Sequence, residues 1–257
     1  MNPVATLGQF FIAFMTSLGR LSMFTGTSFA AMFTPLYRRQ LKKQFMEVGF
    51  YSLPVVGLTA IFTGAVLALQ SYSGFSRFNA ESSIATVVVL SITRELGPVL
   101  AALMVAGRVG ASMAAEIGTM RVTEQVDALV TLSTNPFRYL IAPRLWAGLL
   151  CLPMLVLIAD IIGVMGGYMV SVHKLGFNPH SYLKSTFDFL EFKDVYSGLV
   201  KAAAFGFIIS LMGCYHGFHS NRGAQGVGRA TTLAVVSASI MILFSNYILT
   251  ELFFSTK

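Results

Sequence analysis

Charged residues are scarce in this sequence, and that scarcity limits the solvents in which the chain can fold. Asp, Glu, Lys and Arg make up 11% of the 257 residues, whereas hydrophobic residues make up 55% and the mean hydropathy is +0.70. So little polar surface does not cover a water-soluble globule of this size. The composition therefore disfavours a soluble all-helical domain and predicts an integral membrane protein.

The sequence also lacks the motifs of common catalytic and nucleotide-binding sites. It contains no GxxxxGK[ST] loop for ATP phosphates, and no HExxH, Ser-His-Asp or Cys-His pattern. We therefore expect no enzymatic activity and no cofactor in this chain, so any ATP-driven step needs another subunit. The cysteines Cys151 and Cys214 lie in apolar runs, as small packing residues do. The group formed by Cys214, His216 and His219 has a metal-binding composition, but its place at the end of a span favours an interfacial loop without metal.

Five apolar stretches are each long enough to cross a bilayer as a helix, which takes roughly 20 residues. They cover residues 48–71, 84–108, 145–172, 195–217 and 230–252. These stretches and their connections use up the chain and leave no room for a separate soluble catalytic domain. We therefore predict an all-α integral membrane protein in which residues 1–257 form a single domain.

The N-terminal stretch is less regular than the five spans. Residues 4–36 are rich in Phe and Met, but Arg20 and many Ser, Thr and Gly residues interrupt them. This mixture predicts a helix that lies in the membrane interface. A hairpin that enters the inner leaflet and returns is the alternative, and it leaves the topology unchanged.

Positive charge is distributed unequally between the connections. Counted from Arg38, ten Lys and Arg residues lie just before the first span, between the second and third, or between the fourth and fifth. Five lie in the other connections and at the C-terminus. By the positive-inside rule, the N-terminus is then cytoplasmic and the C-terminus lies outside. Anionic lipid headgroups and orientation signals explain the net charge of +7, so we expect no nucleic-acid partner.

A few ionisable residues interrupt the apolar spans: Arg94, Glu95, Asp160 and Lys201, with Glu251 at the end of the fifth span. Each costs roughly 2.5–3.5 kcal/mol or more if it faces lipid at mid-depth, so these side chains should face protein or water. With the predicted topology they fall in the middle or outer half of the membrane. We hypothesise a polar-lined cavity open to the outer side, with Glu95–Lys201 and Arg94–Asp160 as cross-helix pairs. Structural ion pairs without a cavity are the alternative.

The stretch from Arg94 to Leu129 carries the most specific pattern, RELGPVLAALMVAGRVGASMAAEIGTMRVTEQVDAL. Its Ala and Gly residues let helices approach closely in lipid, and Pro98 predicts a kink or an unwound turn. Residues 119–132 form an amphipathic pattern, with polar positions at Arg121, Glu124 and Asp127 and apolar ones at Val122, Val126 and Leu129. This pattern predicts a short cytoplasmic helix that lies on the membrane or docks into a soluble partner.

The text ELGPVLAALMVAGRVGASMAAEIGTM followed by EQVDAL resembles the MlaE (YrbE) family of ABC transporter permeases, and the similarity covers nearly the whole chain. The resemblance implies a homodimeric permease of the bacterial inner membrane. Such a permease moves phospholipids or related lipids between that membrane and the outer envelope. It also implies a cytoplasmic ATPase dimer that binds the ATP, commonly a small STAS-domain protein, and a periplasmic ring of MCE-domain subunits.

The resemblance also implies roles for particular residues. Residues 119–132 become a coupling helix in the ATPase groove, with the coupling residues Arg121, Glu124, Val126, Asp127 and Leu129. The substrate pathway combines charged residues that meet the lipid headgroup with apolar walls for its tails: Arg94, Glu95, Asp160, Lys201, Leu67, Leu69 and Tyr72.

Two other functions are compatible with the residues. An ion-coupled secondary transporter would use Glu95 and Asp160 as titrating carboxylates within the membrane. Such transporters usually have more spans and an internal repeat, which the sequence does not show. A non-transporting scaffold that anchors envelope proteins is the other alternative. The sequence specifies neither the lipid species nor the direction of transport.

Overall fold

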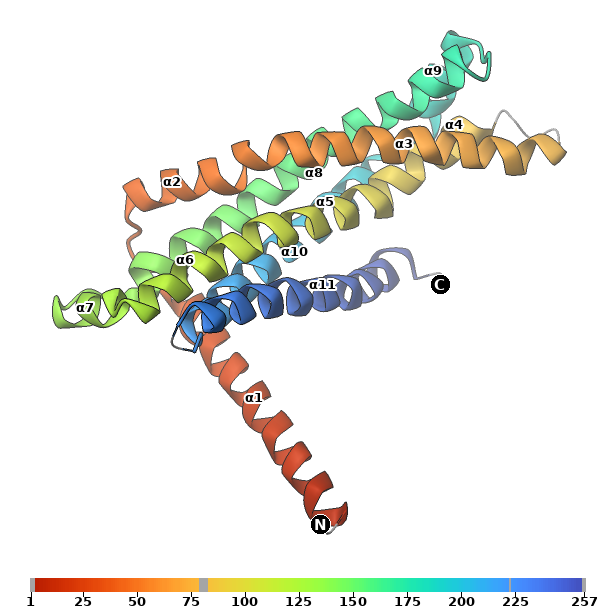
Figure 1. Cartoon of the computed structure of the whole chain (residues 1–257). Helices are drawn as coiled ribbons and strands as arrows, with labels where there is room; N and C mark the ends of the chain where they lie inside the picture. The colour runs from red at the N-terminus through yellow and green to blue at the C-terminus, as the bar shows by residue number, and fades with distance from the viewer. Residues whose placement is uncertain (1–2, 79–82, 222, 256–257) are drawn as a thin grey trace.

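The chain folds into a bundle of long helices (Figure 1). A computed structural model describes residues 3–78, 83–221 and 223–255, and this part of the chain contains helices and no strands. Five helical rods of 27 to 39 residues are long and apolar enough to cross a membrane: Arg38–Phe75, Ile84–Val122, Phe137–His173, Phe192–Phe218 and Ala224–Phe254. The predicted all-α fold with five spans is therefore confirmed, and each rod extends beyond its predicted bounds.

The first rod consists of three consecutive helical segments: α2 (Arg38–Val48), η1 (Phe50–Ser52) and α3 (Leu53–Phe75). The short segment η2 (Ser76–Phe78) follows it. The fourth and fifth rods are the single helices α10 (Phe192–Phe218) and α11 (Ala224–Phe254).

Wide π-helical turns interrupt the second rod and begin the third. The second rod consists of α4 (Ile84–Ser91), η4 (Ile92–Leu96), α5 (Gly97–Val105), η5 (Ala106–Gly110) and α6 (Ala111–Val122). The third consists of η6 (Phe137–Ile141) and α8 (Ala142–His173). The turns η4, η5 and η6 are π-helical, and η4 ends just before Pro98. The irregularity that Pro98 predicts is thus present as a widened turn.

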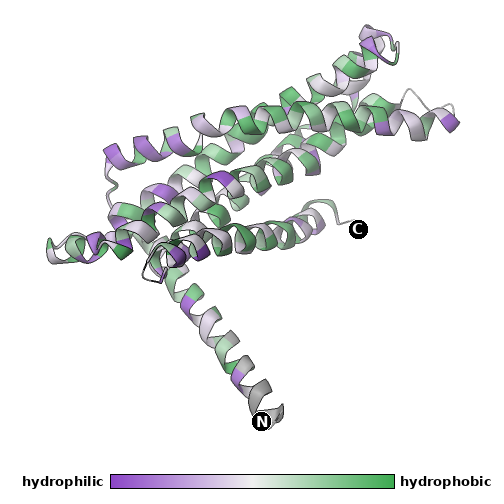
Figure 2. Cartoon of the chain, in the orientation of Figure 1, coloured by the Kyte–Doolittle hydropathy of each residue, from purple (hydrophilic) through white to green (hydrophobic). Residues whose placement is uncertain are grey.

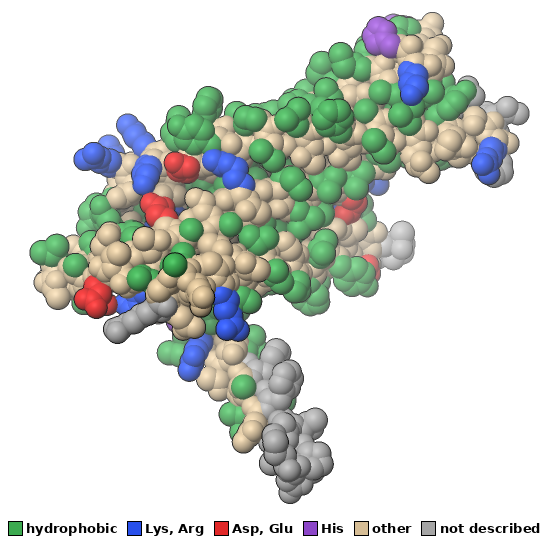
Figure 3. All heavy atoms as spheres, viewed as in Figure 1, with side chains coloured by type: hydrophobic (Ala, Val, Ile, Leu, Met, Phe, Trp, Pro, Cys, Tyr) green, Lys and Arg blue, Asp and Glu red, His purple; other side chains and the backbone are tan. Residues whose placement is uncertain are grey.

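The two ends of the bundle differ in charge. The start of α2, the helix α7 (Gln125–Thr131) and the connection between α10 and α11 lie at one end, and α9 (Pro179–Phe189) and the C-terminus lie at the other (Figure 1). Lys and Arg side chains gather over the start of α2, whereas hydrophobic residues follow the middle of the rods (Figures 2 and 3). Arg222 and Lys257, two of the Lys and Arg residues counted for the predicted topology, lie outside the described residues. The connections richest in positive charge therefore share one end, as the predicted topology requires.

The N-terminal helix α1 (Pro3–Met32) leaves the bundle at an angle (Figure 1). It is one uninterrupted helix without a hairpin turn, and it ends before the predicted bound at residue 36. Its C-terminal part is held by the bundle, because the Phe24 ring lies 5.4 Å from the Phe137 ring and the Trp146 indole N–H donates to the Met32 carbonyl at 3.1 Å. Its placement in the membrane interface stays a prediction.

The predicted helix over residues 119–132 is wrong as a single element. Residues Thr119 to Val122 continue α6, and the shorter α7 begins only at Gln125. Between them Glu124 has a φ of 58°, in the left-handed region, which an α-helix of L-residues cannot continue through. The amphipathic pattern thus spans the end of one helix and the whole of the next.

Glycines let α10 pack closely against the second rod, at η5 and α6. A Cβ on Gly213 would lie 3.0 Å from the Gly110 carbonyl oxygen, and a Cβ on Gly217 would lie 2.9 Å from that of Ala114. Backbones at this separation leave no room for a side chain. The rod that carries Glu95 is therefore closely packed along α10, which carries Lys201.

Candidate functional site

The predicted pair of Glu95 and Lys201 is formed. The Lys201 ammonium lies 2.7 Å from Glu95 Oε1 and also donates to the Arg94 carbonyl at 3.0 Å and to Thr250 Oγ1 at 2.8 Å. The Lys201 side chain is 0% exposed, whereas that of Glu95 is 36% exposed. A fully buried ammonium with a carboxylate and further acceptors is the arrangement that makes such a charge tolerable inside a protein.

Local backbone geometry explains why Lys201 reaches the Arg94 carbonyl. In a regular α-helix the N–H of residue 98 would bond to the carbonyl of residue 94. Pro98 has no N–H, and the π turn η4 ends at Leu96, two residues before it. The Lys201 ammonium donates to this carbonyl instead. Pro98 thus helps to place Lys201 beside Glu95.

The last helix completes the site with two residues that sequence reasoning missed. Asn246 Nδ2 donates to Glu95 Oε2 at 2.9 Å, and Thr250 Oγ1 lies 3.0 Å from Glu95 Oε1. Both belong to α11 and are spaced four residues apart, so they lie on one face of that helix. In the sequence, the four-residue spacing of these two polar side chains within an apolar span was the signal that could have identified them. Both carboxylate oxygens of Glu95 therefore have donors within the chain.

The predicted pair of Arg94 and Asp160 is wrong. Arg94 Nε donates to Asp194 Oδ1 at 2.7 Å, and its guanidinium carbon lies 4.7 Å from the Phe254 ring centroid. Asp194 is fully buried in the first turn of α10, where its other oxygen accepts from the Glu191 N–H. Asp194 and Lys201 are seven residues apart, about two helical turns, so the neighbours Arg94 and Glu95 both find partners on one face of α10.

Asp160 lies in a different environment, between α8 and the start of α5. Its side chain is buried, and its Oδ1 has no hydrogen-bond partner among the described residues. A Cβ on Gly97 would overlap this oxygen, so Asp160 packs directly against the backbone there. Its part in a substrate pathway stays a prediction.

The three predicted apolar wall residues differ in their surroundings. Leu67 and Tyr72 pack against a small cluster of buried residues that includes Ile84 and Val88. The Tyr72 ring lies 5.9 Å from the Phe177 ring. The chain itself therefore partly covers these two side chains. Leu69, on the same helix, is half-buried.

The predicted coupling residues divide into two groups. Val126 is 1% exposed and Leu129 packs against the main core, so these two face the bundle and do not offer an apolar docking surface. Arg121 and Asp127 form an exposed ion pair of 2.6 Å, and Glu124 is exposed at the turn. The exposed surface at the start of α7 is thus polar. Two apolar side chains are exposed near its end: Val130 in the helix and Leu132 just after it.

The histidines near Cys214 do not converge. His216 Nε2 lies 3.0 Å from Ser237 Oγ, whereas His219 Nδ1 lies 2.9 Å from the Tyr215 carbonyl oxygen. Both cysteines are buried and free, as packing residues would be. The described residues contain no group of three or more His, Cys, Asp or Glu side chains that could hold a metal ion.

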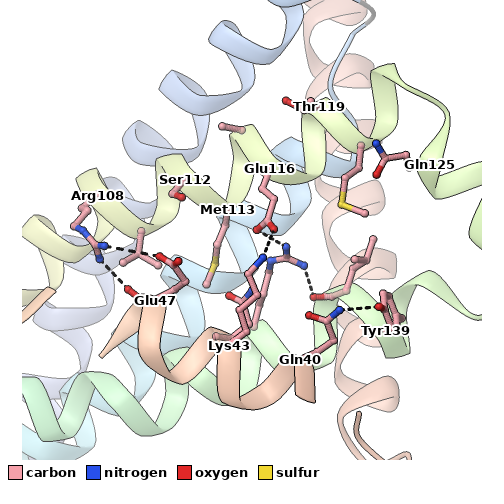
Figure 4. Close-up of a pocket in the computed structure, with 16 residues that line it drawn as sticks. Gln40, Lys43, Glu47, Arg108, Ser112, Met113, Glu116, Thr119, Gln125 and Tyr139 are labelled. Atoms are coloured by element: carbon pink, nitrogen blue, oxygen red, sulfur yellow. Dashed lines mark hydrogen bonds and ion pairs between the residues drawn. The ribbon is translucent and has the colours of Figure 1, made fainter. Parts of the chain in front are cut away.

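A second polar site, which sequence reasoning missed, lies at the basic end of the bundle. A cavity of about 800 Å³ opens there between α2, α6 and the start of the third rod (Figure 4). Glu116 accepts from Arg144 at 2.6 Å and from Lys43 at 3.2 Å. Arg108 donates to the Glu47 carbonyl oxygen at 2.8 Å and to Ser52 Oγ at 2.9 Å. Lys43, Glu116 and Arg144 are far apart in the sequence, so only the packing of α2 against α6 and the third rod reveals the cavity.

Comparisons with known proteins agree with the fold. A family model described as "Permease MlaE" matches residues 41–252. A "Probable ABC transporter permease protein" of Rickettsia felis is 64% identical over 258 aligned positions, which cover 99% of this chain and 98% of that protein. The "Intermembrane phospholipid transport system permease protein MlaE" of Haemophilus influenzae is 36% identical, with 99% and 98% covered. The Arabidopsis thaliana "Protein TRIGALACTOSYLDIACYLGLYCEROL 1, chloroplastic" is 36% identical over 85% of this chain and 63% of its own length.

Proposed function

The chain belongs to the MlaE family of ABC transporter permeases, and from that premise we propose that it is the membrane subunit of an ATP-driven lipid transporter. Phospholipids or related lipids move through it between the bacterial inner membrane and the outer envelope. A separate cytoplasmic ATPase binds and hydrolyses the ATP. The chain itself makes and breaks no covalent bond.

One observation carries the choice of a lipid headgroup as ligand: a polar cluster sits inside apolar spans and is only partly covered. Lys201 is fully buried, yet the side chains of Glu95 and Arg94 keep 36% and 35% of their surface exposed. Charges at this depth do not face lipid tails cheaply. The exposed sides of Glu95 and Arg94 therefore face a polar ligand or water, with hydrophobic helices around them for the acyl chains.

A second copy of the chain would enclose this cluster. The α11 span, which carries Asn246 and Thr250, has only 17% of its most apolar window buried in the single chain. Its exposed side chains include Phe244 and Tyr247. A homodimer that covers this region leaves the Glu95 cluster at the edge of a central cavity, where a lipid headgroup can bind.

The second rod offers a mechanical path from the ATPase to this cavity. The 39 residues from Ile84 to Val122 form one continuous helical rod that carries Glu95 and ends at the turn before α7. A partner that pushes on α7 therefore moves the rod on which Glu95 sits. The π turns η4 and η5 are the points at which this rod can bend.

Orientation and partners follow the same premise. The basic end with α7 faces the cytoplasm, so the N-terminus lies inside, the C-terminus is periplasmic, and the protein resides in the inner membrane. A periplasmic MCE-domain protein contacts the opposite end near α9, and a STAS-domain protein accompanies the ATPase. Cysteine labelling at Thr119 and Ser133 tests this orientation, because labelling from the periplasmic side would contradict it.

Lipid movement in vesicles tests the function itself. The complex is reconstituted with fluorescent phospholipid, once with the native ATPase and once with an ATPase that cannot hydrolyse ATP. We expect movement only with the native ATPase. Movement that an ion gradient drives without nucleotide would contradict the proposal, and so would the absence of movement with every lipid class tested.

A further inference from the structure

The open cavity at the basic end has features of a ligand site of its own. It is lined by side chains of α2, α6 and the third rod, and Glu116 lies about 30 Å from Glu95 along one rod at 1.5 Å per residue. We infer that it binds the headgroup of a zwitterionic glycerophospholipid from the cytoplasmic leaflet, with the phosphate between Lys43 and Arg108 and the headgroup ammonium near Glu47. The inference rests on the proposed orientation, which places this end in that leaflet.

The charges of the cavity leave one cation incompletely balanced. Glu116 is shared between Arg144, at 2.6 Å, and Lys43, at 3.2 Å. Arg144 is buried and also donates to the Leu140 carbonyl, so these contacts fix the position of its guanidinium group. Lys43 has a side chain that is 57% exposed and a single carboxylate that it must share. Its ammonium is therefore available to an anion that enters the cavity.

Arg108 and Glu47 form a loose ion pair, without a hydrogen bond between the guanidinium and the carboxylate. Arg108 Nη1 is bound to the Glu47 carbonyl oxygen and to Ser52 Oγ, but Nη2 lies 3.9 Å from Glu47 Oε2, beyond hydrogen-bonding distance. The guanidinium keeps donors for a phosphate, and the carboxylate keeps acceptors for an ammonium. A ligand that carries both charges in one headgroup satisfies both residues, which a simple anion does not.

The size and the walls of the cavity also fit a lipid headgroup. Its volume of about 800 Å³ lies within the range of small-molecule sites, about 300–1,000 Å³. Apolar side chains line it beside the charges: Val109, Met113, Met120 and Leu140. Arg144 Nε, in the buried wall, has no hydrogen-bond partner among the described residues. Gln125 of α7 is also in the lining, so movement of α7 changes the shape of the site.

Protection of an introduced thiol measures binding directly. Ser112 lines the cavity and is exposed, whereas the natural cysteines Cys151 and Cys214 are buried, so a thiol reagent reacts selectively with the Ser112→Cys variant. The full-length chain is purified in a non-ionic detergent with its copurifying subunits. Short-chain phosphatidylethanolamine, short-chain phosphatidylglycerol and inorganic phosphate are then added separately. We expect phosphatidylethanolamine to protect the thiol most strongly and inorganic phosphate to protect it least.

Charge variants in the same background identify the groups that bind. Lys43→Gln should raise the half-protecting concentration of phosphatidylethanolamine about tenfold, as for the loss of one charge-assisted contact. Lys42→Gln is the matched control, because Lys42 is exposed on the same helix but does not line the cavity. Glu47→Gln should remove the preference for phosphatidylethanolamine over phosphatidylglycerol. Gel filtration verifies that each variant is folded.

Three results would overturn the inference. They are an unprotected thiol with both lipids, equal protection by inorganic phosphate, and equal effects of Lys42→Gln and Lys43→Gln. The first excludes a ligand site, the second a lipid as its occupant, and the third a specific role for the cavity. Because the assay needs neither ATP nor transport, its failure would leave the proposed transport function standing, and a failure of transport would leave this binding result interpretable.

Discussion

Neutralising the two halves of the Glu95–Lys201 pair should have unequal effects on stability. In Glu95→Gln the Lys201 ammonium, which is 0% exposed, loses its carboxylate and stays buried. In Lys201→Met the Glu95 carboxylate, 36% exposed, keeps its donors from Asn246 and Thr250 and remains in reach of water. The asymmetry in burial therefore predicts that removing the carboxylate is the more harmful change.

The magnitudes follow from the same contacts. Removing one partner of a buried ion pair costs about 3–5 kcal/mol, and Glu95→Gln should lie near the lower value because the amide oxygen can still accept from Lys201. Lys201→Met removes three hydrogen bonds, to the partly hydrated Glu95 carboxylate, the Arg94 carbonyl and Thr250 Oγ1. It leaves no charge buried, so its main cost is one unpaired backbone acceptor, about 1–2 kcal/mol. At about 2–4 °C per kcal/mol for a chain of this size, the first variant should lose about 6–12 °C of Tm and the second about 2–8 °C, so the second loss should be the smaller.

Thermal unfolding of the purified full-length protein in detergent measures both shifts. Glu251→Gln is the matched control, because Glu251 is an exposed carboxylate of α11 that directly follows Thr250. It should change Tm by less than about 2 °C, as expected for most surface substitutions. The reasoning from burial would be refuted if Lys201→Met were as destabilising as Glu95→Gln, or if the control matched either of them. Exchanging the two residues should not restore stability, because a carboxylate at position 201 would face the Arg94 carbonyl oxygen, another acceptor.

Three further substitutions test the surroundings of the site. Asp194→Asn should cost about 1–2 kcal/mol of stability by weakening a buried contact to Arg94, whereas the exposed Asp188→Asn should be neutral; denaturation curves of both variants decide this. Pro98→Ala restores an N–H that competes with Lys201 for the Arg94 carbonyl, so lipid transport should fall severalfold without loss of Tm, and unchanged transport would contradict that role. Gly217→Ala should destabilise by about 1–3 kcal/mol, because its Cβ would lie 2.9 Å from the Ala114 carbonyl oxygen. Gly228→Ala, which meets open space, should not destabilise; similar thermal losses in both variants would show that close packing is not the cause.

Sequence reasoning identified the Glu95–Lys201 pair but chose the wrong partner for Arg94, and the difference has a physical reason. Depth in the membrane follows from chain position within a span, so the sequence places Glu95 and Lys201 at similar levels. Depth does not say which helix is adjacent. The predicted fourth span begins at residue 195, which assigns Asp194 to a loop, yet Asp194 lies in the first turn of α10 and contacts Arg94. Asp160 has a suitable charge but packs against Gly97.

Sequence alone determined that the chain folds in a membrane, how many spans it has and at which end positive charge gathers. These properties depend on the length of apolar stretches and on the distribution of charge between them, and both are read along the chain. Tertiary structure decided which polar groups meet: Asn246 and Thr250 at Glu95, Asp194 at Arg94, and the cavity between α2 and α6. It also divided residues 119–132 between two helices at Glu124. Such contacts depend on the rotation and spacing of helices that are remote in the chain, and the periodicity of one helix carries no information about its neighbour.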